Sequence, residues 1–173
     1  LNRVFEWMSF AEQMNMPEVV KRCCSMICFN FERASSLAQW PSLSFEEVQT
    51  ILERSDVVVP GEYSVYLAVE RWLKGQGKVT EQAVATLVSH IQFKSMTVRE
   101  LCEVEESTLV ADSKCATQNI LKPFLYDAFR YVAVKEKHPE GRNEPATFQR
   151  YYSTLTNSFK PAQLEGNCTA NLE

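Results

Sequence analysis

The chain has 173 residues, of which 45% are apolar and 23% are charged, and its formal net charge is −4 at pH 7. This length and apolar content suffice for one domain with a sizeable helical core and an appended tail. Acids and bases are interleaved without a basic cluster, and no apolar run approaches the roughly 20 residues that span a bilayer, which argues against nucleic-acid and membrane partners.

The N-terminal region shows the three-to-four-residue apolar spacing of helices. This spacing predicts a helix over residues 4–14 and a second over 17–29, which starts on a proline suited to a first helical turn. Residues 30–39 are expected to form a short irregular or helical piece. Trp40 and Pro41 close this piece, because the residue before a proline disfavours the helical conformation.

The middle of the chain carries clear start and stop signals. Ser44 and Glu47 have the spacing of a capping box, which predicts a helix to about residue 53. Residues 56–60 contain three valines before a proline, a run too short to found a sheet, and are expected to form an extended linker. A helix then follows over about 61–73, and Gly75 is expected to end it.

Three further helices are expected before the chain changes in composition. Thr80 can cap one of them, and Thr97 with Glu100 forms a second capping box, whose helix over 98–104 leads into an acidic turn. A proline inside a helix removes a hydrogen bond and clashes with the preceding turn. Pro123 therefore predicts either a helix start beside it or a kink, and the C-terminal helix is expected over 123–134.

These elements predict an all-α fold of stacked antiparallel helical hairpins over residues 1–137. Residues 138–173 are predicted to be a linker and an irregular C-terminal tail, because proline, glycine and polar residues dominate their start. The part from 146 onward has too few apolar residues for its own core, so it lies on something else, begins a downstream region or is disordered.

No constellation for catalysis, cofactor binding or metal binding is present in the sequence. The two histidines, His90 and His138, have no cysteine or carboxylate at ligand spacing. Cys23 and Cys24 are adjacent, and successive helical positions point about 100° apart, so they do not converge on one metal. No phosphate-binding glycine loop or nucleophile motif occurs. We therefore expect no enzyme and no cofactor.

Two groups of side chains allow both a structural and a binding interpretation. Cys24 and Cys28 stand four residues apart on an apolar helical face, where cysteine behaves as a small buried hydrophobe, so the cysteines are expected to be reduced and structural. Trp40, Trp72, Tyr66 and Phe45 could line a peptide groove, although such aromatic residues are more often core residues.

Four stretches of the chain resemble the BACK domain, the helical segment that follows a BTB domain, and the resemblance covers about residues 2–133. The stretch Glu62-Tyr-Ser-Val-Tyr-Leu-Ala-Val-Glu-Arg-Trp72 is similar to the family's Glu-x-x-Val-Phe-x-Ala-Val-x-x-Trp helix. Residues 24–31, 51–59 and 91–96 resemble a helix end, a linker and a turn of the family, with Gln92 in place of the usual arginine.

The resemblance implies structural roles for three of the matched residues. Asp56 and Glu62 flank the extended linker and can cap the next helix, while Trp72 anchors the hairpin that follows. Residues 39–43 and the stretch Phe148-Gln-Arg-Tyr-Tyr-Ser153 look closest to the branch of galectin-binding scavenger glycoproteins and their BTB relatives. The sequence lacks any kelch blade motif.

The resemblance further implies a non-enzymatic interaction scaffold. An upstream BTB domain would form a homodimer, and the helices would space it from a downstream recognition region. In cytoplasmic adaptors of cullin-RING ubiquitin ligases, this arrangement joins a cullin scaffold to a substrate protein. The residues nearest the cullin would be Phe5, Met8, Glu12 and Met16, although apolar residues at helical spacing usually face a core.

A second branch implies a different compartment and function, that of a secreted, oligomeric, galectin-binding glycoprotein. Asn167-Cys-Thr matches the short N-glycosylation pattern, which is relevant only on the secretory route. Because the chain opens on Leu1 and not on methionine, we expect a piece of a longer protein without its targeting information. The sequence therefore leaves cytoplasmic and secreted locations open, with the cytoplasmic adaptor as the first expectation.

Overall fold

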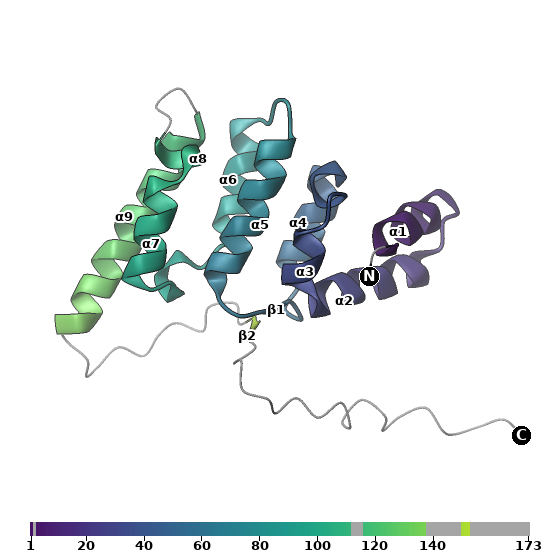
Figure 1. Ribbon diagram of the computed structural model, residues 1–173, viewed down its shortest axis with the longest axis horizontal. Helices are drawn as coiled ribbons and strands as arrows, with labels where there is room; N and C mark the ends of the chain where they lie inside the picture. The colour runs from purple at the N-terminus through teal and green to yellow at the C-terminus, as the bar shows by residue number, and fades with distance from the viewer. Residues whose placement is uncertain (2, 112–115, 138–149, 153–173) are drawn as a thin grey trace, which may run out of the picture.

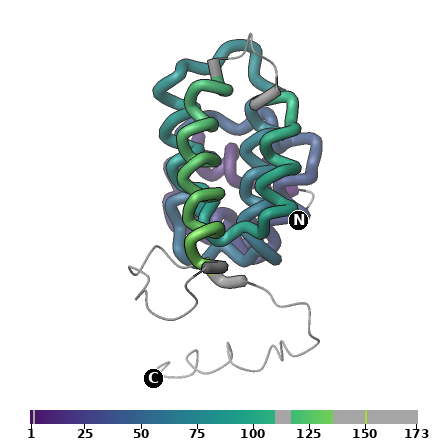
Figure 2. Tube along the Cα trace, turned by 90° about the vertical axis from the view of Figure 1, so that its left-hand side faces the viewer, coloured from purple at the N-terminus to yellow at the C-terminus, as the bar shows by residue number. Residues whose placement is uncertain are grey.

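Helical pairs stand side by side in a row in the computed structural model, which describes residues 1, 3–111, 116–137 and 150–152. The row runs from the N-terminal pair at one end to the C-terminal helix at the other (Figure 1). Figure 2 looks along the row from the C-terminal end, where α9 and α7 lie side by side in front of the earlier helices. The predicted all-α fold of stacked helical hairpins is confirmed.

The predicted helices follow in the expected order, and α8 is an additional short helix. The helices are α1 (Val4–Gln13), α2 (Pro17–Phe29), α3 (Phe31–Ser35), α4 (Phe45–Glu53), α5 (Glu62–Gly75), α6 (Glu81–Ser89), α7 (Val98–Glu106), α8 (Thr108–Ala111) and α9 (Ala116–Lys137). Two 3₁₀ turns, η1 (Trp40–Ser42) and η2 (Phe93–Ser95), and two two-residue strands, β1 (Val58–Val59) and β2 (Tyr151–Tyr152), complete the described elements.

The helix caps predicted at Ser44, Thr80 and Thr97 are present. In the capping box of α4, the Ser44 backbone N–H donates to the Glu47 carboxylate over 2.6 Å and the Glu47 N–H donates to the Ser44 hydroxyl over 3.2 Å. Thr97 and Glu100 form the same box at the start of α7. At the end of α1, Asn15 adopts a left-handed φ of 52°, a conformation that asparagine tolerates and that commonly terminates helices. Local chemistry therefore sets these boundaries.

Trp40 ties the first half of the row together. Its ring makes edge contacts with Phe5 of α1 and Phe31 of α3, with ring centroids 6.4 and 5.7 Å away. Its indole N–H donates to the Ala68 carbonyl of α5 over 2.9 Å. Three helices thus meet at one buried side chain, whose polar atom has the partner that burial requires.

Gly75, the last residue of α5, is a glycine for a steric reason. A Cβ at this position would overlap the side chain of Pro41 in η1, so only glycine allows α5 and η1 to approach this closely. The neighbouring Gln76 side chain donates to the Pro41 carbonyl over 2.6 Å. The predicted helix end at Gly75 is confirmed, and close packing against Pro41 explains why this position is a glycine.

Two helix boundaries and one strand pairing differ from the expectations drawn from the sequence. The prediction that the C-terminal helix spans 123–134 is wrong, because α9 begins at Ala116 and contains Pro123 in its interior. The acidic residues 103–106 belong to α7 and do not form a turn. The linker at 56–60 is extended, but Val58 and Val59 pair in parallel with Tyr151 and Tyr152. This last pairing joins segments that are far apart in sequence, so local spacing could not reveal it.

The predicted domain boundary at residue 137 stays a prediction, but β2 shows that the chain beyond it contacts the helices. β2 and the preceding Arg150 are the described residues after α9, and both lie against the middle of the row. Within the described part of the chain, no helix has both the length and the apolar character needed to cross a membrane.

Replacing Pro123 by alanine should stabilise the domain. Pro123 is exposed in the interior of α9, where proline lacks the N–H of a helical hydrogen bond and costs about 3 kcal/mol relative to alanine. We expect Pro123→Ala to raise the free energy of unfolding by about 1–3 kcal/mol in urea denaturation monitored by circular dichroism. An unchanged or lower stability would show that the proline is required for the path of α9.

Candidate functional site

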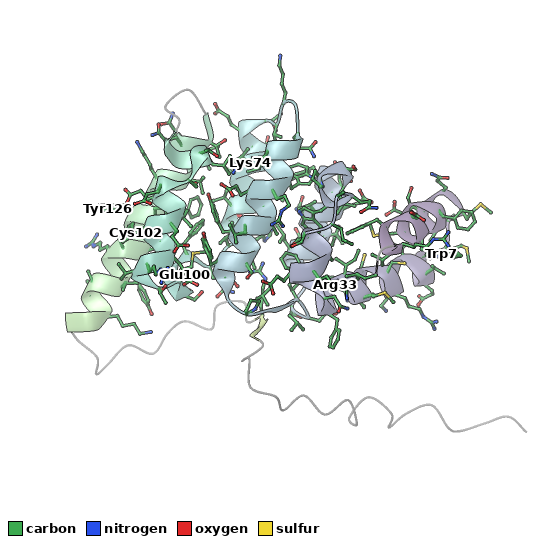
Figure 3. The ribbon with its side chains drawn as sticks, in the orientation of Figure 1. Trp7, Arg33, Lys74, Glu100, Cys102 and Tyr126 are labelled. Carbon is green, nitrogen blue, oxygen red and sulfur yellow. The ribbon has the colours of Figure 1, made fainter. Side chains whose placement is uncertain are left out.

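The N-terminal pair carries most of the large apolar side chains that are exposed in the described residues. Six of the eight such residues lie on α1, on α2 or in the connection between them: Trp7, Phe10, Met14, Met16, Met26 and Phe29. We call these six residues the N-terminal apolar surface. Trp7 and Phe10 are 53% and 49% exposed, and their rings make an edge contact at 6.2 Å. Figure 3 shows Trp7 at the N-terminal end of the row.

A pocket opens within this surface between α1 and α2. Its volume is about 330 Å³, and its lining includes Trp7, Val19, Cys23 and Met26. Exposed aromatic and methionine side chains beside a concave apolar lining are typical of sites that bind protein partners. The surface therefore qualifies as a candidate interaction site.

The four predicted contact residues do not share one surface. Phe5 and Met8 are core residues, with exposures of 6% and 1%, and Phe5 packs on Trp40. Glu12 and Met16 are exposed, and Met16 belongs to the N-terminal apolar surface. A partner contact by Phe5 and Met8 is not compatible with their burial, so this part of the expectation is corrected.

Helix α1 is apolar on two faces, which explains the misplaced contact set. Phe5 and Met8 form one stripe at helical spacing and face the core. Trp7, Phe10 and Met14 form a second stripe with the same spacing and face outward. The second stripe could have revealed this surface from the sequence, because an apolar face beyond the one that packs on the core is free to pack against another partner.

Glu62 lies in the first turn of α5, and its side chain has no exposed surface. Its carboxylate accepts a hydrogen bond from the Gln92 backbone N–H over 3.0 Å. It also forms an ion pair with Arg150, whose Nη1 donates to the two carboxylate oxygens over 2.9 and 2.7 Å. The Arg150 side chain is equally buried. Glu62 was predicted to have a structural role, and its partner in the structure, Arg150, is one that sequence spacing did not indicate.

Arg150 reaches two backbone carbonyls in addition to Glu62. Its Nη2 donates to Leu52 in the last turn of α4 and to His90, the C-cap of α6, over 2.9 Å each. Carbonyls at helix C-termini lack intrahelical donors and carry partial negative charge. Burial, with a further contribution from the charge of Arg150, lowers the pKa of His90, while Glu53 opposes this effect.

Asp56 does not cap α5, which corrects the expected capping role. Gly61 occupies the N-cap position of α5 without a side-chain cap. Asp56 instead accepts two hydrogen bonds from Arg54, from Nε over 2.8 Å and from Nη2 over 2.6 Å, and these bonds lower the pKa of its carboxyl group. Arg54 also donates to Ser25, so the pair fastens the start of the linker to α2.

Trp72 anchors α5 to the segment that precedes it in the chain. Its side chain is buried, and its indole N–H donates to the Leu43 carbonyl over 2.8 Å. Trp72 was predicted to anchor the hairpin that follows it. The hydrogen bond that the structure shows for its indole goes instead to the preceding segment. With Trp40 and Tyr66 also buried, these aromatic residues belong to the core and do not line a peptide groove.

The cysteine-rich helix α2 shows no feature of a reactive site. Cys23, Cys24 and Cys28 are buried and free, and burial raises the pKa of Cys28 to about 12, which disfavours the nucleophilic thiolate. Within the described residues, no group of three or more histidine, cysteine or acidic side chains could hold a metal ion. Asn167 lies outside the described residues.

The chain matches one protein family and is similar to several known proteins. The family model described as "BACK: BTB And C-terminal Kelch" matches residues 4–106. BTB/POZ domain-containing protein 17 of Xenopus tropicalis is 20% identical over 158 residues, which are 91% of this chain and 31% of that protein. Galectin-3-binding protein of Pongo abelii is 34% identical over 85 residues, 49% of this chain and 14% of that protein.

A third relative, Kelch-like protein 8 of Caenorhabditis elegans, is 21% identical over 135 residues, which cover 78% of this chain and 19% of that protein. The chain thus spans less than a third of the length of each of these relatives. The functions of these longer proteins can therefore be assigned to this chain only as a proposal.

Replacing Trp72 by phenylalanine should destabilise the domain, because the change leaves the Leu43 carbonyl without its donor and creates a cavity. We expect a loss of about 2–4 kcal/mol in the free energy of unfolding. Trp7→Phe is the matched control, since Trp7 is half exposed and its replacement should cost about 0.5 kcal/mol or less. Equal losses in the two variants would contradict the anchoring role.

Proposed function

This chain belongs to the BACK family, and we propose that it is the non-enzymatic scaffold segment of a longer protein, between an upstream BTB dimer and a downstream recognition region. The family match and the BTB and kelch-like relatives support this role. The row of helical pairs suits a scaffold role, because it holds a partner bound at one end at a distance from a partner bound elsewhere along the row (Figure 1).

We further propose that the longer protein is a cytoplasmic substrate adaptor of a cullin-RING ubiquitin ligase. The N-terminal apolar surface would contact the cullin scaffold. Met16 and Glu12, which are both exposed, would be the members of the predicted contact set that take part. The observation behind this proposal is the concentration of exposed aromatic and methionine side chains on α1 and α2. Such side chains contribute most of the binding energy in many protein interfaces.

The buried cysteines agree with this compartment. Three free thiols on α2, Cys23, Cys24 and Cys28, pack as core side chains. Free thiols of this kind are usual in the reducing cytoplasm, whereas small secreted domains tend to use cysteines as disulfides. This preference supports the adaptor proposal over a secreted one.

A secreted, oligomeric glycoprotein is the second proposal, because a galectin-3-binding protein is 34% identical over about half of this chain. The glycosylation pattern at Asn167 offers a direct test. If this proposal is right, the full-length protein expressed in a secreting cell line should carry an N-glycan at Asn167. Treatment with a glycosidase should then lower the mass of the protein. A mass that glycosidase leaves unchanged would remove the support that Asn167 gives to this proposal.

The adaptor proposal predicts that the double substitution Trp7→Ala with Phe10→Ala weakens cullin association. Hot-spot residues of an interface, among which tryptophan is enriched, cost about 2 kcal/mol or more when they are truncated, so we expect a loss of affinity of at least about 30-fold. The measurement is biolayer interferometry of the full-length protein on an immobilised cullin N-terminal domain.

Tyr126→Ala provides the matched control. Tyr126 is an exposed aromatic residue, 72% exposed, on α9 at the opposite end of the row from Trp7 (Figure 3). Its replacement should leave the affinity unchanged. If wild-type protein does not bind the cullin, the adaptor proposal fails. If it binds and the double variant binds equally well, the contact does not lie on the N-terminal apolar surface.

A further inference from the structure

The ion pair between Glu62 and Arg150 marks a binding site that none of the family relationships above describes. We propose that Glu62, the ends of α4 and α6 and the edge of β1 form a docking site for an extended strand that carries an arginine. The occupant is this chain's own segment, residues 150–152. Docking anchors the chain beyond α9 to the middle of the row of helices.

The part of the site contributed by the helices is also held by contacts that do not involve Arg150. Glu62 is fixed by the first turn of α5 and by the hydrogen bond from the Gln92 N–H. The carbonyls of Leu52 and His90 are at the ends of α4 and α6, where backbone oxygens have no intrahelical donor. One carboxylate and the negative ends of two helices thus converge on a single buried position, which favours a cation.

The geometry selects arginine over lysine. Nη1 of Arg150 donates to both carboxylate oxygens of Glu62, while Nη2 donates to the two carbonyls of Leu52 and His90. A planar guanidinium presents these donors in a fixed fork, whereas an ammonium is a compact point charge at the end of a flexible stem. Lysine therefore could not make the full set of bonds from one position.

The backbone of the docked segment adds a second element of recognition. Val58 pairs with Tyr151 and Val59 with Tyr152, in parallel register, directly after Arg150. Addition of an extended segment to an exposed strand edge is a known mode of peptide recognition, in which backbone pairing gives affinity and a side-chain pocket gives specificity. Here β1 provides the edge, and the Glu62 site provides the pocket.

The position of the docking site determines where the chain leaves the row of helices. β1 and β2 lie together at one edge of the row, near α3 and the start of α5, and away from the C-terminal end of α9 (Figure 1). The chain after residue 152 therefore starts from the middle of the row. This consequence for a downstream region depends on the proposed scaffold function, but docking of the segment does not.

Limited digestion with trypsin tests the docking, because trypsin cleaves after Arg150 itself. The rate of cleavage at Arg150 in the full 173-residue chain is measured by mass spectrometry and divided by the rate in a free peptide of residues 146–155. We expect at least about tenfold protection in the wild-type chain, since a buried arginine must undock before it is cleaved. Wild-type cleavage as fast as in the peptide would overturn the proposal.

Two substitutions remove the recognition without removing the trypsin site. Glu62→Gln removes the buried carboxylate, and Arg150→Lys, compared with a peptide carrying the same lysine, removes the fork of donors. In both variants, protection at residue 150 should fall to about threefold or less, because Glu62→Gln breaks the buried ion pair and Arg150→Lys leaves buried hydrogen-bond acceptors without a donor. Glu53→Gln, which changes a half-exposed carboxylate next to His90, is the matched control and should keep full protection.

Cleavage after Arg71 in α5 separates undocking from unfolding. Arg71 is partly buried, and its side chain donates to the Ser35 carbonyl of α3 over 2.6 Å. Undocking predicts that residue 150 loses its protection in these variants while Arg71 remains protected. Loss of protection at both sites would mean that the segment is an inseparable part of the core, and this result would overturn the proposal of a docking site.

Dilution identifies the occupant. Docking within one chain predicts that protection at Arg150 does not depend on protein concentration. Loss of protection on dilution would assign the docked segment to a second copy of the chain and would overturn an occupant from the same chain. None of these measurements involves a cullin, so their failure is distinguishable from failure of the adaptor proposal.

Discussion

The buried carboxylate of Glu62 is the constraint on which the arrangement of the middle of the molecule depends. A carboxylate without solvent contact needs hydrogen-bond donors around it, since leaving a buried charge unpaired costs several kcal/mol, a large share of the stability of a typical domain. Gln92 and Arg150 provide these donors, and Arg150 in turn engages Leu52 and His90. One charged group thus joins the ends of α4 and α6 and the start of α5 to a segment 88 residues further along the chain.

Most of the helical fold could be predicted from the sequence because its signals are local. The capping boxes at Ser44 and Thr97 depend on residues three apart, and apolar spacing identifies each buried face from residues within two turns. Pro123 was misleading for the same reason. Its local penalty favours a helix start, but α9 packs along α6, α7 and α8, and tertiary contact outweighs the cost of one lost hydrogen bond.

The candidate sites were harder to predict, because they depend on contacts between distant residues. The second apolar stripe of α1, with Trp7 and Phe10, is visible in the sequence, but only the packing shows that this stripe faces outward while Phe5 faces Trp40. Arg150 lies in a stretch that matched a family branch, yet nothing in its spacing pointed to Glu62. The interaction scaffold that the family match supports therefore has two distinct surfaces, an apolar one at its N-terminal end and a charged docking site in its middle.

A double-mutant cycle on Glu62 and Arg150 tests the central claim most directly. Urea unfolding of the full chain would be compared for wild type, Glu62→Gln, Arg150→Met and the double variant. A coupled buried pair predicts that each single change costs about 3–5 kcal/mol and that the double variant loses less than the sum by at least about 2 kcal/mol. Losses that add to within about 0.5 kcal/mol would show that the two side chains act independently, and this would contradict the account.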